Sequence, residues 1–339
     1  MKAAAEAAID ATATATSTPT FTPGPPSAVD ISLRPITAGS DTAIGVTSNG
    51  LSYIAYQDAA THLQLIRCLT TDCSQNVEST IDSASQTAYE ISMEMNSQDL
   101  PVMTYYEFNL SRVRVAFCVD VSCTPSVYLF PGNYTTNGAI ALELDSNDVP
   151  YIAYRTYFGD FIRIVRCNSA TTCDTQSFIG AIASSGSAFD FRLDSNNIPI
   201  IVDSLTTRLI RCNSSISCSS PTISNFGAIT GSINQPSLAL NSNNIPWILF
   251  RGGFDARLAL CESATSCVNP SIFVLAPEVG GYGSTLALDN DVPVVGFRID
   301  PSDGTNDYVT IARCESTTTC NTPSFLPYDT NRQFEIIFL

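Results

Sequence analysis

Histidine, tryptophan and positive charge are scarce in this sequence. Its 339 residues include one histidine, one tryptophan and 16 lysine or arginine residues, against 32 aspartate or glutamate residues. The resulting net charge of −16 repels phosphate backbones, which excludes nucleic-acid binding. No apolar run reaches the roughly 18 residues of a transmembrane helix, so we expect no membrane span in this chain. No apolar leader follows Met1, and we expect either that a leader has been removed or that a longer protein contains this chain.

Motifs of catalysis are also missing. The sequence contains no Gly-x-Ser-x-Gly, no His-Glu-x-x-His and no glycine loop of the phosphate-binding kind. His62 lies between two predicted strands of the most degenerate repeat, where an exposed loop residue is the simpler interpretation than a general base. We therefore predict a protein that is not an enzyme, with no catalytic residues and no cofactor.

Six copies of one motif fill the chain from about residue 28 onward. The clearest copy runs from Leu238 to Phe250, contains the turn Asn-Ser-Asn-Asn-Ile-Pro, and leads to two cysteines. Self-similarity at a fixed period is typical of repeat architectures. The first cysteines recur every 45 to 53 residues, and the repeats span about 41–84, 85–135, 136–184, 185–231, 232–278 and 279–333.

Each copy contains four strand signals. Segments with alternating apolar and polar residues, such as that ending at Leu144, are separated by turn clusters rich in Asp, Asn and Ser. Four antiparallel strands per repeat fit the blade of a propeller, whose closed ring protects the sheet edges. A parallel β-solenoid is the alternative, but its coils have shorter periods. The sequence predicts an all-β, six-bladed propeller of four-stranded antiparallel blades over residues 28–339.

In its Asp-Ser-Asn-x-x-Pro hairpins, as at Asp145–Pro150, the chain resembles bacterial secreted β-propeller repeat proteins. The resemblance covers roughly residues 28–339. It implies a fold and a surface location, without a single activity.

Both ends exceed what six blades require. Residues 1–27 form a Thr/Ala/Pro-rich segment, which favours an extended tail or linker and cannot build a core. Val29–Arg34 aligns with the fourth strand of a blade, and Phe334–Leu339 aligns with a first strand. These strands could pair as a partial blade, act as a clasp, or pair with a neighbouring molecule.

Twelve cysteines form six local pairs, each placed where a third strand turns into a fourth. Zinc is the rival interpretation, but one pair per blade keeps the thiols at separate rim positions, and four ligands must meet. We predict disulfides, no metal site and an oxidising compartment, hence a secreted or cell-surface location. The predicted pairs are Cys68 with Cys73, Cys118 with Cys123, Cys167 with Cys173, Cys212 with Cys218, Cys261 with Cys267, and Cys314 with Cys320.

Carboxylates and aromatic residues give weaker signals. The Asp/Asn-rich turns lack the spacing of a calcium loop, so we interpret them as plain hairpin turns. Trp247 and Tyr151 occupy equivalent positions, and packing between blades is favoured over stacking on sugars. Paired carboxylates could support glycoside hydrolysis, but four of them sit at repeated strand and turn positions, which favours an architectural role. These four are Glu143, Asp145, Asp190 and Asp194.

Two functional classes remain. We favour a non-enzymatic extracellular structural or adhesive protein that assembles with itself, into a polymer or filament, through its terminal segments. The alternative is a lectin-like propeller that binds surface glycans from a Thr/Pro stalk.

Overall fold

A computed structural model describes the propeller and leaves the two termini outside. It covers residues 42–326 except for 85–88, 130–134, 157–160, 185, 187, 205–207, 227–233, 253–254, 277–283 and 300–307. The predicted tail at residues 1–27 lies outside the described residues, as do the surplus segments 29–34 and 334–339. No helix long and apolar enough to cross a membrane occurs in the described ranges.

The described strands form six antiparallel sheets of four strands each. Blade 1 contains β1 (Thr42–Val46), β2 (Ser52–Gln57), β3 (Leu63–Cys68) and β4 (Asn76–Asp82); blade 2 contains β5 (Tyr89–Met95), β6 (Pro101–Glu107), β7 (Arg112–Cys118) and β8 (Pro125–Leu129). Blade 3 contains β9 (Thr135–Leu144), β10 (Pro150–Thr156), β11 (Phe161–Cys167) and β12 (Gln176–Ala183); blade 4 contains β13 (Phe189–Leu193), β14 (Pro199–Asp203), β15 (Arg208–Arg211) and β16 (Thr222–Asn225). Blade 5 contains β17 (Asn234–Leu240), β18 (Pro246–Gly252), β19 (Asp255–Leu260) and β20 (Ser271–Ala276); blade 6 contains β21 (Ser284–Asp289), β22 (Val292–Ile299), β23 (Tyr308–Arg313) and β24 (Ser324–Leu326).

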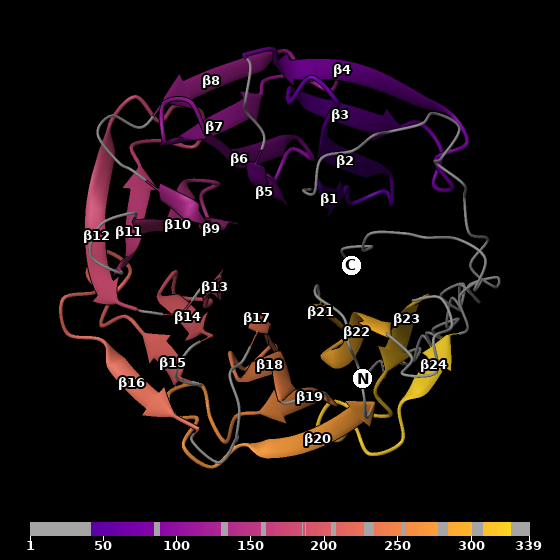
Figure 1. Cartoon of the computed structure of the whole chain (residues 1–339), viewed down its shortest axis with the longest axis vertical. Helices are drawn as coiled ribbons and strands as arrows, with labels where there is room; N and C mark the ends of the chain where they lie inside the picture. Colours follow the sequence, from indigo (N-terminus) through magenta and orange to yellow (C-terminus); the bar gives the residue numbers. More distant parts are fainter. Residues whose placement is uncertain are drawn as a thin grey trace, which may run out of the picture.

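The blades stand around a common axis, with the first strand of each blade innermost and the fourth outermost (Figure 1). Within every sheet the strands follow one another in chain order. This arrangement confirms the predicted six-bladed propeller and excludes the solenoid, whose coils pair in parallel.

Asp and Asn predominate at the first and fourth positions of the hairpin turns between the first and second strands. In blade 3 the Oδ1 atom of Asp145 accepts hydrogen bonds from the backbone N–H groups of Asn147 and Val149, both at 2.9 Å. The fourth turn residue, Asp148, has a φ of 60°, which Asn, Asp and Gly tolerate best. Equivalent residues with φ between 59° and 82° are Gly50, Asp99, Asn197, Asn244 and Asp291. The hairpin-turn interpretation is thus confirmed.

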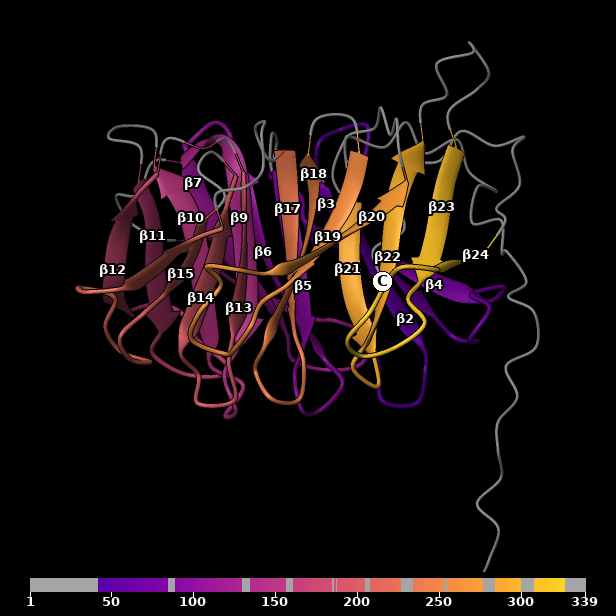
Figure 2. The ribbon, with the colours of Figure 1, turned by 90° about the horizontal axis from the view of Figure 1, so that it is seen from below.

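One face of the propeller, here called the turn face, contains both these turns and the loops closed by disulfides. Because alternate strands run in opposite directions, the turns after the first and third strands lie at the same end of each blade (Figure 2). The second strand of each blade ends, and the third begins, at the opposite face.

Adjacent turns are bonded to one another from blade 1 to blade 6. A serine at the second turn position donates its backbone N–H, at 2.8 to 3.1 Å, to the Asp or Asn side chain at the fourth turn position of the next blade. The serine hydroxyl forms a second bond to the same side chain. The pairs are Ser48–Asp99, Ser97–Asp148, Ser146–Asn197, Ser195–Asn244 and Ser242–Asp291.

All six predicted cysteine pairs are disulfides, and no cysteine is free. Six disulfides in one chain are typical of an oxidising environment. The bonded pairs are Cys68 with Cys73, Cys118 with Cys123, Cys167 with Cys173, Cys212 with Cys218, Cys261 with Cys267, and Cys314 with Cys320.

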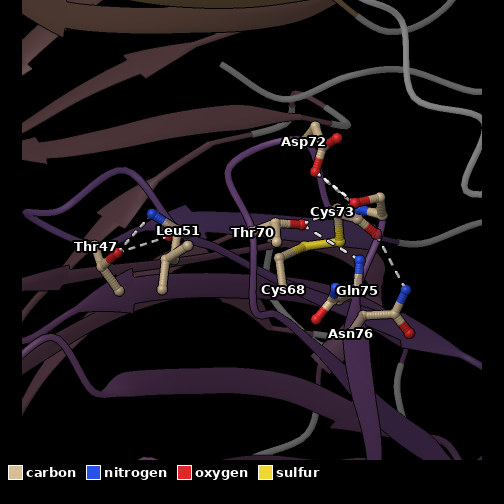
Figure 3. The surroundings of a disulfide bond; sticks show 9 residues. Thr47, Leu51, Cys68, Thr70, Asp72, Cys73, Gln75 and Asn76 are labelled. Atoms are coloured by element: carbon tan, nitrogen blue, oxygen red, sulfur yellow. Dashed lines mark hydrogen bonds between the residues drawn. A yellow bond between two sulfur atoms is a disulfide. The ribbon is translucent and has the colours of Figure 1, made fainter.

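Side-chain hydrogen bonds close the loop around the disulfide of blade 1 as well (Figure 3). The Thr70 hydroxyl accepts from the Gln75 backbone N–H at 3.3 Å, and the Asn76 amide donates to the Cys73 carbonyl at 3.2 Å. The short loop is therefore held by its own polar groups in addition to the covalent bond.

The hydrophobic core is divided among the seams between blades. Five clusters of buried side chains each join two consecutive blades, from blades 1 and 2 to blades 5 and 6. In each cluster, the disulfide belongs to the later blade and packs against the earlier one. The sixth cluster contains only blade 1 residues among those described, namely Ile54, Tyr56, Ile66, Cys68 and Cys73.

The disulfides are more deeply buried than a position on the rim suggests. The sequence analysis placed the pairs at separate rim positions; the structure keeps them separate, one to a blade, but packs them into the seams. The second cysteines of blades 3 to 6 are at most 2% exposed, namely Cys173, Cys218, Cys267 and Cys320. A Cβ atom added at Gly180 of blade 3 would lie 2.7 Å from the Cβ atom of Cys218, so the close packing of this seam requires glycine there.

Candidate functional site

The innermost strands carry one position at which the six blades differ sharply. Two residues before each turn, a position here called the axis position, blades 1, 5 and 6 have Gly45, Ala239 and Ala287. Blades 2, 3 and 4 have Glu94, Glu143 and Arg192 instead. Residues that support the architecture recur in every blade, so a departure confined to three neighbouring blades marks a candidate site.

Arg192 is the centre of this axis cluster, which consists of Glu94, Glu143, Asp190 and Arg192. The Nη1 atom of Arg192 donates to Glu143 Oε1 at 3.1 Å and lies 3.3 Å from Asp190 Oδ1. It also donates to the backbone carbonyl of Phe191 at 2.9 Å. A single guanidinium nitrogen therefore brings the carboxyl groups of Glu143 and Asp190 together.

The cluster remains accessible to solvent. The side chain of Arg192 is 31% exposed, that of Glu143 is 15% exposed and that of Asp190 is 16% exposed. Asp190 is held from the next blade as well, because its Oδ2 atom accepts from the Leu238 backbone N–H at 2.6 Å. Blades 3, 4 and 5 thus hold the cluster in place, and its side chains are partly exposed.

Burial and neighbouring charges shift the pKa values of three groups in the cluster, namely Glu94, Glu143 and Arg192. Burial among the inner strands raises the pKa of Glu143 to about 8; Arg192 opposes this shift, and the carboxylates of Glu94 and Asp190 add to it. Burial also raises the pKa of Glu94. The neighbouring carboxylates raise the pKa of Arg192 against the effect of burial, so its guanidinium stays charged. At neutral pH Glu143 is mostly protonated and can donate as well as accept hydrogen bonds.

This arrangement offers hydrogen-bond donors and acceptors in close proximity. Carboxyl groups and a guanidinium are the side chains that bind several hydroxyl groups at once. In the described part of the chain, no group of three His, Cys, Asp or Glu side chains is arranged to hold a metal ion.

The four carboxylates singled out in the sequence separate into two kinds. Glu143 and Asp190 meet at Arg192, as described. Asp145 and Asp194 hold their own turns, and each also forms an ion pair with an arginine of the third strand in its blade. These pairs are Asp145–Arg166, at 2.9 Å, and Asp194–Arg211.

His62 lies in the turn between β2 and β3, on the opposite face from the turn face and in a different blade from the axis cluster. Its Nδ1 atom is 3.3 Å from Asp58 Oδ2, an acidic neighbour that the sequence did not predict. Asp58 also accepts from the backbone N–H groups of Ala60 and His62, at 2.8 and 2.9 Å. The pair therefore organises a turn.

Trp247 and Tyr151 are buried between blades. Trp247 is fully buried and packs against Phe273 with ring centroids 5.9 Å apart. Tyr151 is 2% exposed, and the guanidinium of Arg166 lies 5.5 Å from the centre of its ring. Neither ring offers a free face to a sugar, which confirms the packing interpretation.

Sequence reasoning missed Glu94 and Arg192. The signal that identifies them was present in the aligned repeats, as charged residues where other copies have glycine or alanine.

Comparison with known proteins supports the fold and identifies no function. No family model matches the chain, and no curated protein matches it. Among solved structures, an ulvan lyase matches with a TM-score of 0.55 at 9% identity over 84% of this chain and 80% of its own. A mutant of AofleA from Arthrobotrys oligospora gives 0.54 at 8% identity over 85% and 86%. A protein from Lactobacillus plantarum gives 0.53 at 8% identity over 84% and 83%.

Likeness at such low identity shows the fold alone. The chain is a six-bladed, disulfide-containing propeller whose candidate site lies at the axis positions of blades 2, 3 and 4.

Proposed function

We propose that this chain is a non-enzymatic extracellular adhesive protein that binds a neutral glycan at the axis cluster. The six disulfides support a location outside the reducing cytoplasm. The observation that carries the proposal is the confinement of Glu94, Glu143 and Arg192 to three adjacent axis positions, with small residues at the other three.

The chemistry of the cluster favours a polyhydroxylated ligand without negative charge. Sugar hydroxyl groups donate to Asp190 and accept from Arg192, while Glu143 can do either. The net charge of −16 and the nearby carboxylates repel sulfated or uronic sugars. A hydrolytic role is less well supported, because the Arg192 guanidinium donates to Glu143 and lies within ion-pair distance of Asp190, so both carboxyl groups already have a partner.

Calorimetric titration with neutral and sulfated oligosaccharides tests this proposal. We expect neutral glycans to bind and to be recovered intact, and we expect Glu143→Leu and Arg192→Leu to weaken binding about tenfold or more. Arg313→Leu is the matched control, since Arg313 pairs with Asp289 in blade 6 and Leu260 occupies the equivalent position in blade 5. Its affinity should equal that of the wild type.

Two results would contradict the proposal. One is equal affinity in all variants, which would remove the axis cluster from recognition. The other is cleavage of the oligosaccharide by the wild type and not by Glu143→Gln, which would make the protein a glycosidase.

Structural self-assembly is the second candidate function. It is favoured by the seam between blades 6 and 1, where the apolar cluster of blade 1 includes no described residue of another blade. Assembly through residues 1–27 remains a prediction, because those residues lie outside the described ranges.

A further inference from the structure

The seam between blades 6 and 1 lacks the turn pair that bonds the other five. Blade 1 has Gly50 at the fourth turn position, where the other blades have an Asp or Asn acceptor. The turn of blade 6 is one residue shorter, and no serine stands between Asp289 and Asn290. Both halves of the missing pair are thus absent from the sequence itself, and only at this seam.

The apolar faces at this seam are also less covered than elsewhere. On blade 1, Tyr56 and Ile66 are each 7% exposed, whereas their counterparts in blade 3, Tyr154 and Val165, are 0% and 3% exposed. On blade 6, Val295 and Ala312 pack toward blade 5. Because side chains alternate between the two faces of a sheet, the residues next to them in the sequence face the seam with blade 1.

Those blade 6 neighbours are Val294 and Ile311, which remain partly exposed. Their counterparts in blade 5, Trp247 and Leu258, are fully buried. Two apolar faces therefore confront the seam without forming the common cluster found at the other five.

The chain after β24 has the length and the pattern of a strand that would fill this position. Seven residues, 327–333, separate β24 from Phe334. The other connections between a fourth strand and the next first strand contain five to eight residues. Crossing three strand spacings takes about 14 Å, and seven extended residues reach about 23 Å.

The sequence of the terminal segment matches an innermost strand. Phe-Glu-Ile-Ile-Phe at residues 334–338 follows the pattern of Phe-Asp-Phe-Arg-Leu at residues 189–193 in β13. The match includes the acidic residue after the first phenylalanine, which in β13 is Asp190.

We propose that the seam between blades 6 and 1 is a docking site for a single β-strand, and that its occupant is the chain's own segment Phe334–Leu339. Seated between blades 6 and 1, this strand directs alternate side chains toward Val294 of β22 on one side and toward Tyr56 of β2 on the other. A strand at this place covers apolar side chains of both faces, so the ring closes through the C-terminal segment.

The full chain carrying Ile336→Asp tests the docking site. We expect its Tm to fall by about 5 °C or more and amide hydrogen exchange to accelerate in β1 and β21. Ile223→Asp is the matched control, because Ile223 is 46% exposed on the outermost strand β16. It should change neither the Tm nor the exchange in β1 and β21.

Light scattering distinguishes the chain's own segment from that of a second copy. When each chain fills its own seam, Ile336→Asp should leave the oligomeric state of the full chain unchanged, whether or not the tail joins one chain to another. Dimers or polymers that dissociate in Ile336→Asp would overturn the assignment of the occupant. Unchanged Tm and unchanged exchange in Ile336→Asp would overturn the docking site itself.

Discussion

At the scale of single residues, the axis cluster shows how a repeated scaffold changes the ionisation of one side chain. The position that holds alanine in blades 5 and 6 holds Glu143 in blade 3, beside Glu94 and Asp190. Because burial penalises the charged form, and the neighbouring carboxylates add to this effect, Glu143 keeps its proton well above the ordinary pKa range of a carboxyl group.

This retained proton predicts a decline of stability with rising pH. The pKa of Glu143 is about 8 in the folded protein against an ordinary value of 4.5, so between these values the folded state binds more protons than the unfolded state. The free energy of unfolding should therefore fall on the order of 2 kcal/mol from pH 5 to pH 9. Thermal melts across this range measure it.

Glu143→Gln should flatten the decline, because glutamine has no proton to lose. Part of the slope remains from Glu94, whose pKa is also raised. An equally steep decline in Glu143→Gln would assign the effect to other groups.

At the scale of strands and turns, the repeats contain a natural record of paired substitutions. Where the first turn residue is Asp, the residue before the first cysteine is Arg, and where it is Asn, that residue is Phe or Leu. The charged combination occurs in blades 3, 4 and 6, and the neutral combination in blades 2 and 5. Carboxylate and amide oxygens can both accept the hydrogen bonds of the turn. The charged and neutral combinations therefore differ only in the ion pair between the Asp and the Arg.

A double-mutant cycle at Asp194 and Arg211 in blade 4 tests this reading. Asp194→Asn keeps the turn bonds to Asn196 and Ile198 but leaves Arg211 without its partner, at a cost of about 3 kcal/mol. Adding Arg211→Leu reproduces the combination of blade 5 and should recover about 1 kcal/mol or more.

Urea unfolding with the disulfides intact measures the four free energies of the cycle. Strict additivity of the two single changes would contradict the coupling and would reduce the pattern to coincidence.

At the scale of the whole molecule, stabilising contacts are spread evenly over five seams and are different at the sixth. Each of the five combines an apolar cluster, a buried disulfide and a bonded pair of turns. Such a ring depends on its last seam, because apolar faces left uncovered there can bind another chain. Whether the chain's own segment or a second copy fills that seam decides between a monomer and an assembly.

Assembly through the tail is tested by removing residues 1–27. We expect the full chain to form oligomers and the truncated chain to be monomeric, as measured by light scattering. The measurement belongs at about 0.15 M salt, because a net charge of −16 opposes association at low ionic strength. Monomers in both samples at high concentration would reduce the tail to a spacer.

The sequence by itself determined the number of blades, the four strands of each, the hairpin turns and all six disulfides. These features follow from local rules that act within a few residues, namely alternation, turn residues with positive φ, and cysteines a short loop apart. Six copies of the same rules made each inference stronger. The family resemblance added an expected location and no activity.

Only the tertiary structure decided which charged residues meet. Glu143 and Arg192 are 49 residues apart in the chain, and their contact exists because neighbouring blades bring their innermost strands together. The burial of the disulfides in the seams has the same origin, because each one packs against the blade before its own. The sixth cluster differs from the other five, which each join two blades, because its described residues all belong to blade 1. Contacts across seams depend on how the ring closes, a property of the whole chain that no single repeat contains.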